Sequence, residues 1–497
     1  MQNLQKLSTW FTILMVSALM ISVGAAAPSG GTFAGKPPTK TPTPTPGGPT
    51  PTNTPSGPAP NVTIPNTLIG QSPTSIGAVE ACTRFNIADL LDWGAKNYRI
   101  YADMARFEPV DDDGVYGSPT IAQVKANPNI IPFAAWDAQF DRTDAYFFEP
   151  GCSPLGTSSR TILNTLQANG IRPILGLRNV DNKGTPAWAA PLNPPDTAAD
   201  QNEWWEHVFA MVYTINVRYN LDVHDWEVHN QPDNTQQGWG GTQQDYIAFT
   251  QLTHDAIQYV YDTYLPGESF RLHAPVSTHA DDWVTQTLIQ NDAIVEVIDW
   301  HRYGPPADQA MIVHDMINTN NSDGIHEQLH ISEWGNLMNY NGAGRGYAEW
   351  MMDFSRPASK VDFSSIFSMY DWGATTCCLG IVRADGTKTP TFYALRMVIR
   401  ATQSAKNVYQ INTSVNRPML ATKDPLTGKL YFTIMNPGAQ PISITLDVGA
   451  HLTTGTATIY EHDDVTFFDT QTGTASISGG RVSFSVPKRS NMQLEMQ

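Results

Sequence analysis

The sequence has little positive charge. Of its 497 residues, 30 are Lys or Arg and 47 are Asp or Glu, which gives a formal net charge of −17. Charged residues make up only 15% of the chain. Nucleic acids and anionic membrane surfaces attract proteins through basic patches, so this composition argues against both as partners.

Cysteine is also scarce. The chain has four, at Cys82, Cys152, Cys377 and Cys378, with no Cys-x-x-Cys pair and no His/Cys cluster of zinc-like spacing. We therefore expect neither a metal site nor a cofactor. In an exported protein four cysteines allow three disulfide pairings, of which we favour Cys82 with Cys152 by elimination.

Long apolar runs are confined to the N-terminus. Lys6 precedes an apolar run from Phe11 to Val23, and Ala25-Ala26-Ala27 follows as a small-residue cleavage site. This order is typical of a secretory signal, which we assign to residues 1–27. The run is shorter than the roughly 20 residues that span a bilayer. We expect export, with no membrane insertion once the signal is removed.

A segment rich in Pro, Thr, Gly and Ser follows, at residues 28–60. Such a composition has no side chains with which to build a core, and it stays extended. We interpret it as a linker that holds a domain at the cell surface or another attachment point. A passive exported tail is the alternative.

From residue 61 to 403, short apolar runs alternate with segments of helical periodicity. Several of the runs are almost continuously apolar, which is typical of strands buried on both faces. The expected strands are Thr67–Gly70, Tyr98–Ala102, Ile171–Leu177, Asp225–His229, Phe270–Ala274, Val295–Trp300, Gln328–Ser332 and Ser364–Tyr370. Eight strands that alternate with helices predict a (β/α)8 TIM barrel. A doubly wound sheet is the alternative, but no Gly-x-Gly-x-x-Gly follows the first strand.

The pattern changes to period two between residues 404 and 497. Alternating runs at 429–434, 442–448, 456–460 and 481–486 are separated by turn residues such as Asn436-Pro437-Gly438. They predict a small C-terminal antiparallel β-sandwich domain. This domain either covers the barrel or binds sugar.

Polar side chains stand where the expected barrel strands end. The carboxyl ends of barrel strands face the active site, so these side chains should meet there. They are Asn230 and Gln231 after the fourth strand, His301 and Tyr303 at the sixth, Glu333 at the seventh and Trp372 at the eighth. A carboxylate, amides, an imidazole, a phenol and an indole together suit a carbohydrate ligand.

The sequences at two of these strand ends resemble known sequence motifs. Trp226-Glu227-Val228-His229-Asn230-Gln231-Pro232-Asp233 is similar to the aromatic-Glu-Val-Trp-Asn-Glu-Pro-Asp phrase of glycoside hydrolase family 39, the β-xylosidase and iduronidase group. His301-Arg302-Tyr303 resembles the His-x-Tyr of the sixth strand in the same group. The chain thus looks like a clan A retaining glycoside hydrolase over about residues 65–402.

The resemblance implies a role for each matching residue. Glu333 corresponds to the nucleophile that attacks the anomeric carbon, and Gln231 stands at the acid/base position. Asn230 corresponds to the residue that bonds the sugar 2-hydroxyl. Tyr303 is implied to bond Glu333 and keep it ionised, and His301 to contact substrate nearby.

Two further residues take roles from the resemblance. Trp372 is implied to form the floor of the subsite that holds the cleaved sugar, and Arg99 to steady the nucleophile from the second strand. Packing in the core is the alternative for Tyr303, His301 and Trp372. Glu227 is expected to be a buried structural acid, and Asp233 a loop cap.

Gln231 departs from the family pattern, in which this residue is Glu. An amide can hydrogen-bond a glycosidic oxygen but cannot transfer a proton, and general acid–base help is worth roughly 10²–10⁴ in rate. Three hypotheses follow. Another group, such as Asp233, His229 or Asp137, supplies the proton; the leaving group needs none, as in plant myrosinases, which also carry Gln here; or the protein binds carbohydrate without catalysis.

Overall fold

The structure is a computed structural model that describes residues 59–81, 84–111, 114–144, 156–178, 189, 193–235, 239–304, 307–320, 324, 326–335, 344–371 and 379–497. The expected signal segment, nearly all of the linker and all four cysteines lie outside these residues. The disulfide pairing and the domain boundaries therefore stay predictions. No described helix is both long and apolar enough to cross a membrane.

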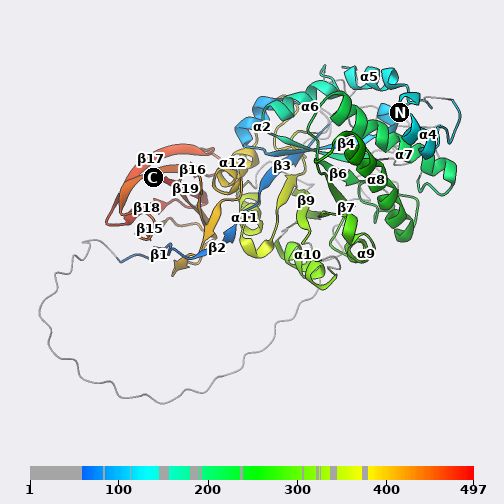
Figure 1. The fold of residues 1–497 in the computed structure, drawn as a ribbon. Coiled ribbons are helices and arrows are strands. Elements are labelled where there is room, and N and C mark those ends of the chain that lie inside the picture. The colour runs from blue at the N-terminus through cyan, green and yellow to red at the C-terminus, as the bar shows by residue number, and fades with distance from the viewer. Residues whose placement is uncertain are drawn as a thin grey trace, which may run out of the picture. The chain divides into compact units, whose positions relative to one another are not determined.

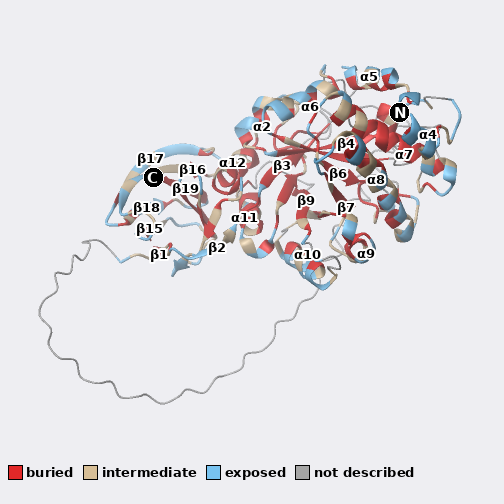
Figure 2. Cartoon of the chain, in the orientation of Figure 1, coloured by how far each residue is buried: buried red, intermediate tan, exposed pale blue. Residues whose placement is uncertain are grey.

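Eight parallel strands close into a barrel, as the sequence predicts (Figure 1). In order around the barrel they are β3 (Ser75–Val79), β4 (Asn97–Asp103), β5 (Arg172–Arg178), β6 (Asp225–Val228), β7 (Arg271–Ser277), β8 (Val297–Tyr303), β9 (Gln328–Gly335) and β10 (Phe363–Ile366), which pairs back to β3. Their residues are almost all buried, because helices cover the outer face (Figure 2).

Helices separate the barrel strands along the chain. They are α2 (Ile87–Trp93), α3 (Met104–Phe107), α4 (Ile121–Ala126), α5 (Phe133–Asp141), α6 (Ser159–Ala168), α7 (Ala198–Val212), α8 (Gln243–Tyr264), α9 (Asp282–Gln290), α10 (Ala307–Asn320), α11 (Gly344–Phe354) and α12 (Pro390–Thr402). Short turns of other helix types lie at 128–130, 213–218, 292–294 and 357–359. The two longest helices, α8 and α7, begin at capping boxes, where Thr242 pairs with Asp245 and Thr197 with Asp200.

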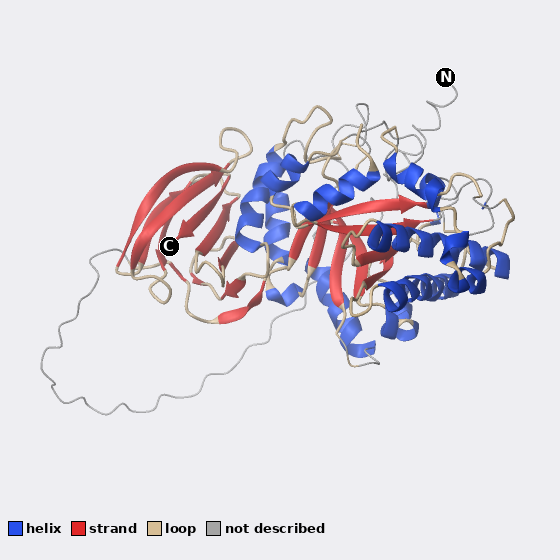
Figure 3. Cartoon of the chain, turned by 45° about the horizontal axis from the view of Figure 1, so that its top comes forward, coloured by secondary structure: helices blue, strands red, loops and turns tan. Residues whose placement is uncertain are grey.

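A second sheet of 11 strands is built without helices of its own (Figure 3). Its strands are β1 (Val62–Thr63), β2 (Leu68–Gln71), β11 (Asn407–Tyr409), β12 (Asn412–Thr413), β13 (Met419–Lys423), β14 (Leu430–Asn436), β15 (Ile442–Asp447), β16 (Thr454–His462), β17 (Thr470–Ser478), β18 (Arg481–Val486) and β19 (Ser490–Met496). The sheet folds over an apolar core, in which Phe432 of β14 meets Phe484 of β18. The expected TIM barrel with a C-terminal β domain is confirmed.

The expected first barrel strand, Thr67–Gly70, is wrong. Residues 68–71 form β2, which pairs antiparallel with β11 of the second sheet, and Leu68 and Ile69 are about half exposed. The first barrel strand is β3, where Gly77 packs directly against Asn97 and leaves no room for a side chain. β1 and β2 precede the barrel in the chain but belong to the sheet that follows it.

Candidate active site

The loop after β6 has an unusual backbone. His229 and Gln231 have φ of 67° and 50°, in the left-handed region that residues other than glycine seldom adopt. The Gln231 N–H donates to the carbonyl oxygen of Val276 (2.9 Å), and Val276 also has a positive φ. Such strained positions persist where the surrounding structure holds them, and they gather at functional sites. The end of β6 is thus tied to the end of β7, which fixes Gln231.

Glu333 lies near the end of β9 and accepts hydrogen bonds from several donors. Arg99 donates to Oε1 (2.7 Å), Tyr101 donates to the same oxygen, and Tyr303 donates to Oε2. The His301 Nδ1 atom is 3.3 Å from Oε2. Burial pushes the pKa of Glu333 up, but the charge of Arg99 and the hydrogen bonds from Tyr101 and Tyr303 outweigh it and hold the pKa below its ordinary value. The carboxylate is therefore ionised at neutral pH.

Arg99 joins three strand ends. It is fully buried in β4 and donates to Glu227 Oε2 (2.6 Å), to Glu333 Oε1 and, through Nη2, to Asn230 Oδ1 (3.0 Å). A guanidinium fork holds its partners in one geometry, so it fixes these side chains relative to one another. The Tyr101 hydroxyl also donates to Asn230 Oδ1 (3.2 Å). The Asn230 amide oxygen is thus engaged from within the barrel, which leaves its N–H groups as the donors for a ligand.

Gln231 has neutral neighbours. Its Nε2 donates to His301 Nδ1 (2.7 Å), and its Oε1 accepts from Asn234 (3.3 Å). Burial lowers the pKa of His301 to about 4, so the imidazole is neutral and its proton sits on Nε2. Because Gln231 Nε2 and Glu333 Oε2 lie 2.7 and 3.3 Å from the same nitrogen, they are at most 6.0 Å apart.

Six of the seven predicted site residues come together at this end of the barrel, and the seventh, Trp372, lies outside the described residues. The six are Arg99, Asn230, Gln231, His301, Tyr303 and Glu333. Their assigned roles stay predictions. Sequence reasoning missed Tyr101, which bonds both Glu333 and Asn230. The alternation of a strand was the available signal, since residues two apart share a face and Arg99 was already placed on it.

The alternative proton donors are engaged elsewhere. Asp233 accepts from the backbone N–H (2.9 Å) and the hydroxyl of Thr278, as a loop cap does. Asp137 lies on α5, bonded to Arg218 (2.5 Å) and Tyr219 (2.6 Å). Among the contacts of the described residues, neither carboxylate touches Gln231 or Glu333.

His229 is no better placed. Its ring packs edge-on against Trp239 and Phe249, and burial lowers its pKa to about 3. Its Nδ1 faces the Asn230 carbonyl oxygen (3.0 Å), and its Nε2 has no hydrogen-bond partner among the described residues. The imidazole is thus a neutral core group.

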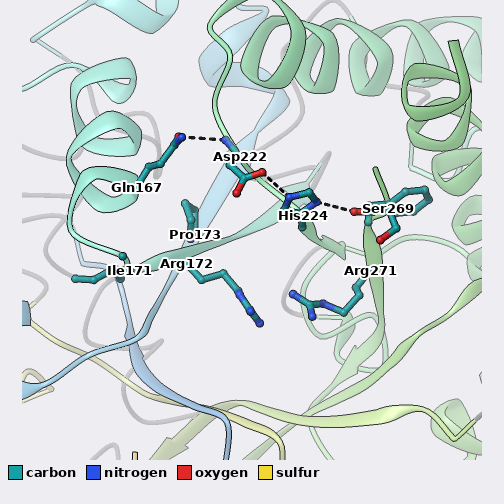
Figure 4. A pocket seen from close by; sticks show the side chains of 10 residues that line it. Gln167, Ile171, Arg172, Pro173, Asp222, His224, Ser269 and Arg271 are labelled. Atoms are coloured by element: carbon teal, nitrogen blue, oxygen red, sulfur yellow. Dashed lines mark hydrogen bonds and ion pairs between the residues drawn. The ribbon is translucent and has the colours of Figure 1, made fainter. Parts of the chain in front are cut away.

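A cavity of about 400 Å³ lies at the opposite end of the barrel, where β5 and β7 begin (Figure 4). Its charged groups are already paired. Arg271 and Arg172 bind Asp225 (2.7 and 3.4 Å), and His224 bonds Asp222 (2.5 Å). Active sites of TIM barrels lie at the carboxyl ends of the strands, so we place the chemistry at Glu333 and not in this cavity.

Two groups of described side chains have ligand atoms close enough for a metal ion. One is exposed, at the rim of this cavity, and consists of Asp222, His224 and Glu268. The other is buried inside the barrel below Glu333 and consists of Glu227, His273, Asp299 and His330.

Comparison with solved structures places the fold among glycoside hydrolases. The chain is similar to the GH39 enzyme from Xanthomonas axonopodis pv. citri, with a TM-score of 0.61, 12% identity, and coverage of 90% of this chain and 99% of that one. A GH30 endoxylanase from Clostridium papyrosolvens gives a TM-score of 0.60 at 13% identity, with coverage of 88% and 100%. A monomeric beta-xylosidase from Caulobacter crescentus gives 0.59 at 13% identity, with coverage of 88% and 99%.

No protein-family model matches the chain, and no curated protein sequence does. The likeness to solved structures is therefore one of fold. It confirms the predicted similarity to clan A glycoside hydrolases, a group that includes the GH30 and GH39 folds. The chain has a glycoside hydrolase fold, that is, a TIM barrel followed by a β domain.

Proposed function

We propose that this protein is a glycoside hydrolase that acts on β-linked oligosaccharide or polysaccharide by a retaining-type mechanism. In this proposal Glu333 is the nucleophile and Gln231 stands at the acid/base position. The observation that carries it is the contact of both side chains with His301 Nδ1, which puts Gln231 Nε2 and Glu333 Oε2 at most 6.0 Å apart. Retaining glycosidases separate their two catalytic groups by about 5–5.5 Å, and inverting ones by about 6.5–9.5 Å.

The nucleophile has what the first step requires. Glu333 is ionised, and donors on both oxygens hold it in one orientation. Its attack on the anomeric carbon forms a glycosyl ester and breaks the bond to the leaving oxygen. The free N–H groups of Asn230 suit the sugar 2-hydroxyl, a contact that strengthens in the transition state.

The leaving oxygen meets an amide instead of an acid. Gln231 donates a hydrogen bond but keeps its proton, so the leaving group departs as an anion. Departure is fast for a stabilised anion and slow for an alkoxide. We therefore expect wild type to cleave β-linked oligosaccharides, whose leaving group is an alkoxide, slowly, and glycosides with a stabilised leaving group fast. Water then hydrolyses the ester at Glu333, without help from a base at position 231.

A second candidate function is carbohydrate binding without catalysis. It is favoured by one observation, that Asp233 and Asp137 are bound to other side chains and do not reach Gln231. In that case the barrel mouth would hold sugar through Asn230 and the aromatic groups, and Glu333 would remain as an inherited feature.

The test compares activated and unactivated substrates. Dinitrophenyl β-glycosides of several sugars and the matching methyl glycosides are incubated with wild type and with Glu333→Gln. We expect wild type to release dinitrophenolate and to leave the methyl glycosides intact, and we expect Glu333→Gln to cleave neither substrate. Sodium azide, an anionic nucleophile that needs no general base, should speed turnover of the activated substrate if hydrolysis of the glycosyl ester limits the rate.

Two other outcomes would overturn parts of the proposed function. Binding of oligosaccharide by calorimetry, with no turnover of any activated glycoside, would support the binding function and overturn the proposed one. Cleavage of methyl glycosides would show that another group supplies the proton, and would overturn the account of Gln231.

We also propose that the protein is exported, with residues 28–60 as a spacer at the cell surface. The signal-like order of residues 1–27 supports this. Sequencing of the mature N-terminus from culture medium should give a chain that begins near Pro28. Retention of Met1 on a chain found only inside the cell would contradict it.

A further inference from the structure

A group of four ionisable side chains lies inside the barrel, one layer below Glu333. Glu227 of β6, His273 of β7, Asp299 of β8 and His330 of β9 come from four consecutive strands, and each is fully buried. Glu227 pairs in register with His273, and Asp299 with His330. One atom from each side chain lies within 4.8 Å of the other three.

The distances within the group resemble those around a tetrahedral ion. Asp299 Oδ2 is 2.9 Å from His330 Nδ1 and 3.3 Å from His273 Nδ1, and the two Nδ1 atoms are 3.3 Å apart. Glu227 Oε1 is 3.7 Å from His330 Nδ1. Tetrahedral bonds of about 2.0–2.1 Å put neighbouring donor atoms roughly 3.3–3.4 Å apart, and the four distances above, from 2.9 to 3.7 Å, lie around this value.

Hydrogen-bond partners on the far side of each imidazole decide where its proton lies. His273 Nε2 faces Asp225 Oδ1 (3.1 Å), a carboxylate that can only accept. His330 Nε2 faces the Ser365 hydroxyl (3.1 Å), and that hydroxyl already donates to Asn97 Oδ1 (2.9 Å). Both imidazoles therefore donate through Nε2, so in their neutral forms the two Nδ1 lone pairs point into the group.

In their neutral forms the two imidazoles thus turn both Nδ1 lone pairs toward Asp299 Oδ2 and Glu227 Oε1, and Glu227 Oε1 has no hydrogen-bond partner among the described residues. A buried carboxylate oxygen without a hydrogen-bond partner destabilises the folded state, because it has lost its contacts with water and gained none in exchange. Imidazole nitrogens that accept from an ion while they donate behind to a carboxylate or hydroxyl are typical of protein metal sites.

We propose that Glu227, His273, Asp299 and His330 bind a divalent cation of the zinc type. Two imidazole nitrogens and two carboxylate oxygens suit Zn²⁺, whereas Ca²⁺ and Mg²⁺ take oxygen ligands. Four protein ligands leave no open position, so the ion is structural and does not enter the chemistry. Glu227 keeps its Oε2 for Arg99. The ion thereby fixes Glu227, Glu227 fixes Arg99, and Arg99 orients Glu333.

The experiment measures metal in the full chain after expression in zinc-supplemented medium. We expect about one zinc per chain after dialysis against a chelator, because the site is closed. X-ray absorption at the zinc edge should show nitrogen and oxygen ligands at about 2.0–2.1 Å, and no sulfur at about 2.3 Å. The spectrum distinguishes this site from the four cysteines and needs no variant.

Two variants locate the ion. His330→Gln should lose the zinc, whereas His224→Gln, which removes the imidazole of the exposed group, should retain it. A chain that carries no zinc when expressed or refolded with it overturns the proposal, as does a sulfur-ligated ion. Loss of zinc in His224→Gln and not in His330→Gln also overturns it. If His330→Gln fails to fold, the absorption spectrum of wild type decides.

Discussion

The two sides of the barrel mouth differ in charge and in hydrogen bonding. On one side Glu333 is an anion that accepts from Arg99 and two tyrosines. On the other side Gln231 is a neutral amide bonded to a neutral imidazole and to Asn234. The first side has an ionised, oriented carboxylate, as the proposed nucleophile requires. The second side has an amide, which cannot give up a proton, at the proposed acid/base position.

The two sides also affect each other electrostatically. A second carboxylate about 5 Å from Glu333 would favour the protonated form of one of the two, as in other paired carboxylates. With Gln at position 231 that repulsion is absent. Glu333 therefore stays ionised to lower pH than it would beside a glutamate.

Removal of the anion should have the largest effect. Glu333→Gln keeps the shape of the side chain but cannot attack, so kcat/KM for dinitrophenyl glycosides should fall on the order of 10⁴-fold or more. The control is Glu268→Gln at an exposed turn, which should leave the rate unchanged. Equal rates for wild type and Glu333→Gln would mean that another residue is the nucleophile.

Restoration of the acid should have the next largest effect. Gln231→Glu should raise kcat/KM for methyl glycosides or oligosaccharides by about 10²–10⁴, the usual worth of general acid catalysis. Dinitrophenyl glycosides, whose leaving group needs no proton, should gain far less in the glycosylation step. Gln244→Glu on the exposed face of α8 controls for added charge. No gain on any substrate would remove position 231 from the acid/base role.

Loss of one tyrosine hydroxyl that bonds Glu333 should lower the rate. Tyr101→Phe and Tyr303→Phe each remove a hydrogen bond to an ionised carboxylate, worth about 1.5–3 kcal/mol. Part of that energy should appear as a drop in kcat of about 10- to 100-fold. The same change should move the acid limb of the pH profile upward, because it removes a donor that lowers the pKa of Glu333. A loss of rate without this movement would indicate a merely structural effect.

The pH profile of wild-type activity should reflect the ionisation state around Glu333 alone, because Gln231 does not titrate. The pKa of Glu333 lies below its ordinary value of 4.5, and that of His301 is lowered to about 4. Activity on dinitrophenyl glycosides should thus stay level from about pH 8 to about pH 5 and fall only in more acid solution. Because the folded pKa of Glu333 is depressed, its contribution to stability is present above its unfolded pKa. That contribution is lost as pH falls through the folded pKa. A decline in kcat/KM that begins between pH 5 and 7 would contradict this reading of Glu333.

The smallest effect on activity should come from the residue beside the glutamine. Asp233→Asn weakens hydrogen bonds to Thr278, so the free energy of unfolding should fall by about 1–2 kcal/mol. Activity on dinitrophenyl glycosides should change by less than about twofold, since Asp233 does not touch Glu333 or Gln231. A large loss of activity in a well-folded Asp233→Asn variant would restore Asp233 as a proton donor.

The barrel could be predicted from the sequence because its pattern is local. Each buried strand appears in the sequence as an apolar run. The polar residues that come directly after the run therefore lie at the carboxyl end of the strand. The first strand could not be assigned this way. Residues 68–71 do form a strand, but which sheet a strand joins depends on a partner far away, here β11. The true first strand, β3, is five residues long and holds Gly77, so its sequence resembles a loop.

The site was predictable only in part. Asn230, Gln231, His301, Tyr303 and Glu333 stand at strand ends with recognisable neighbours. Tyr101 stands inside a strand, where a phenol is most often a packing residue.

The buried group could not be predicted at all. Its four side chains are spread over more than 100 residues of sequence, with no metal-binding spacing. They approach one another only because the barrel closes.

The most direct test of the central claim is to trap the glycosyl ester. A 2-deoxy-2-fluoro glycoside with a dinitrophenyl leaving group slows hydrolysis of the ester, so the labelled protein accumulates and can be weighed by mass spectrometry. We predict one added sugar per chain, located by peptide mapping to Glu333, and no label on Glu333→Gln. Failure of every sugar in the panel to label the protein, or a label on another residue, would contradict the proposal that Glu333 is a working nucleophile opposite Gln231.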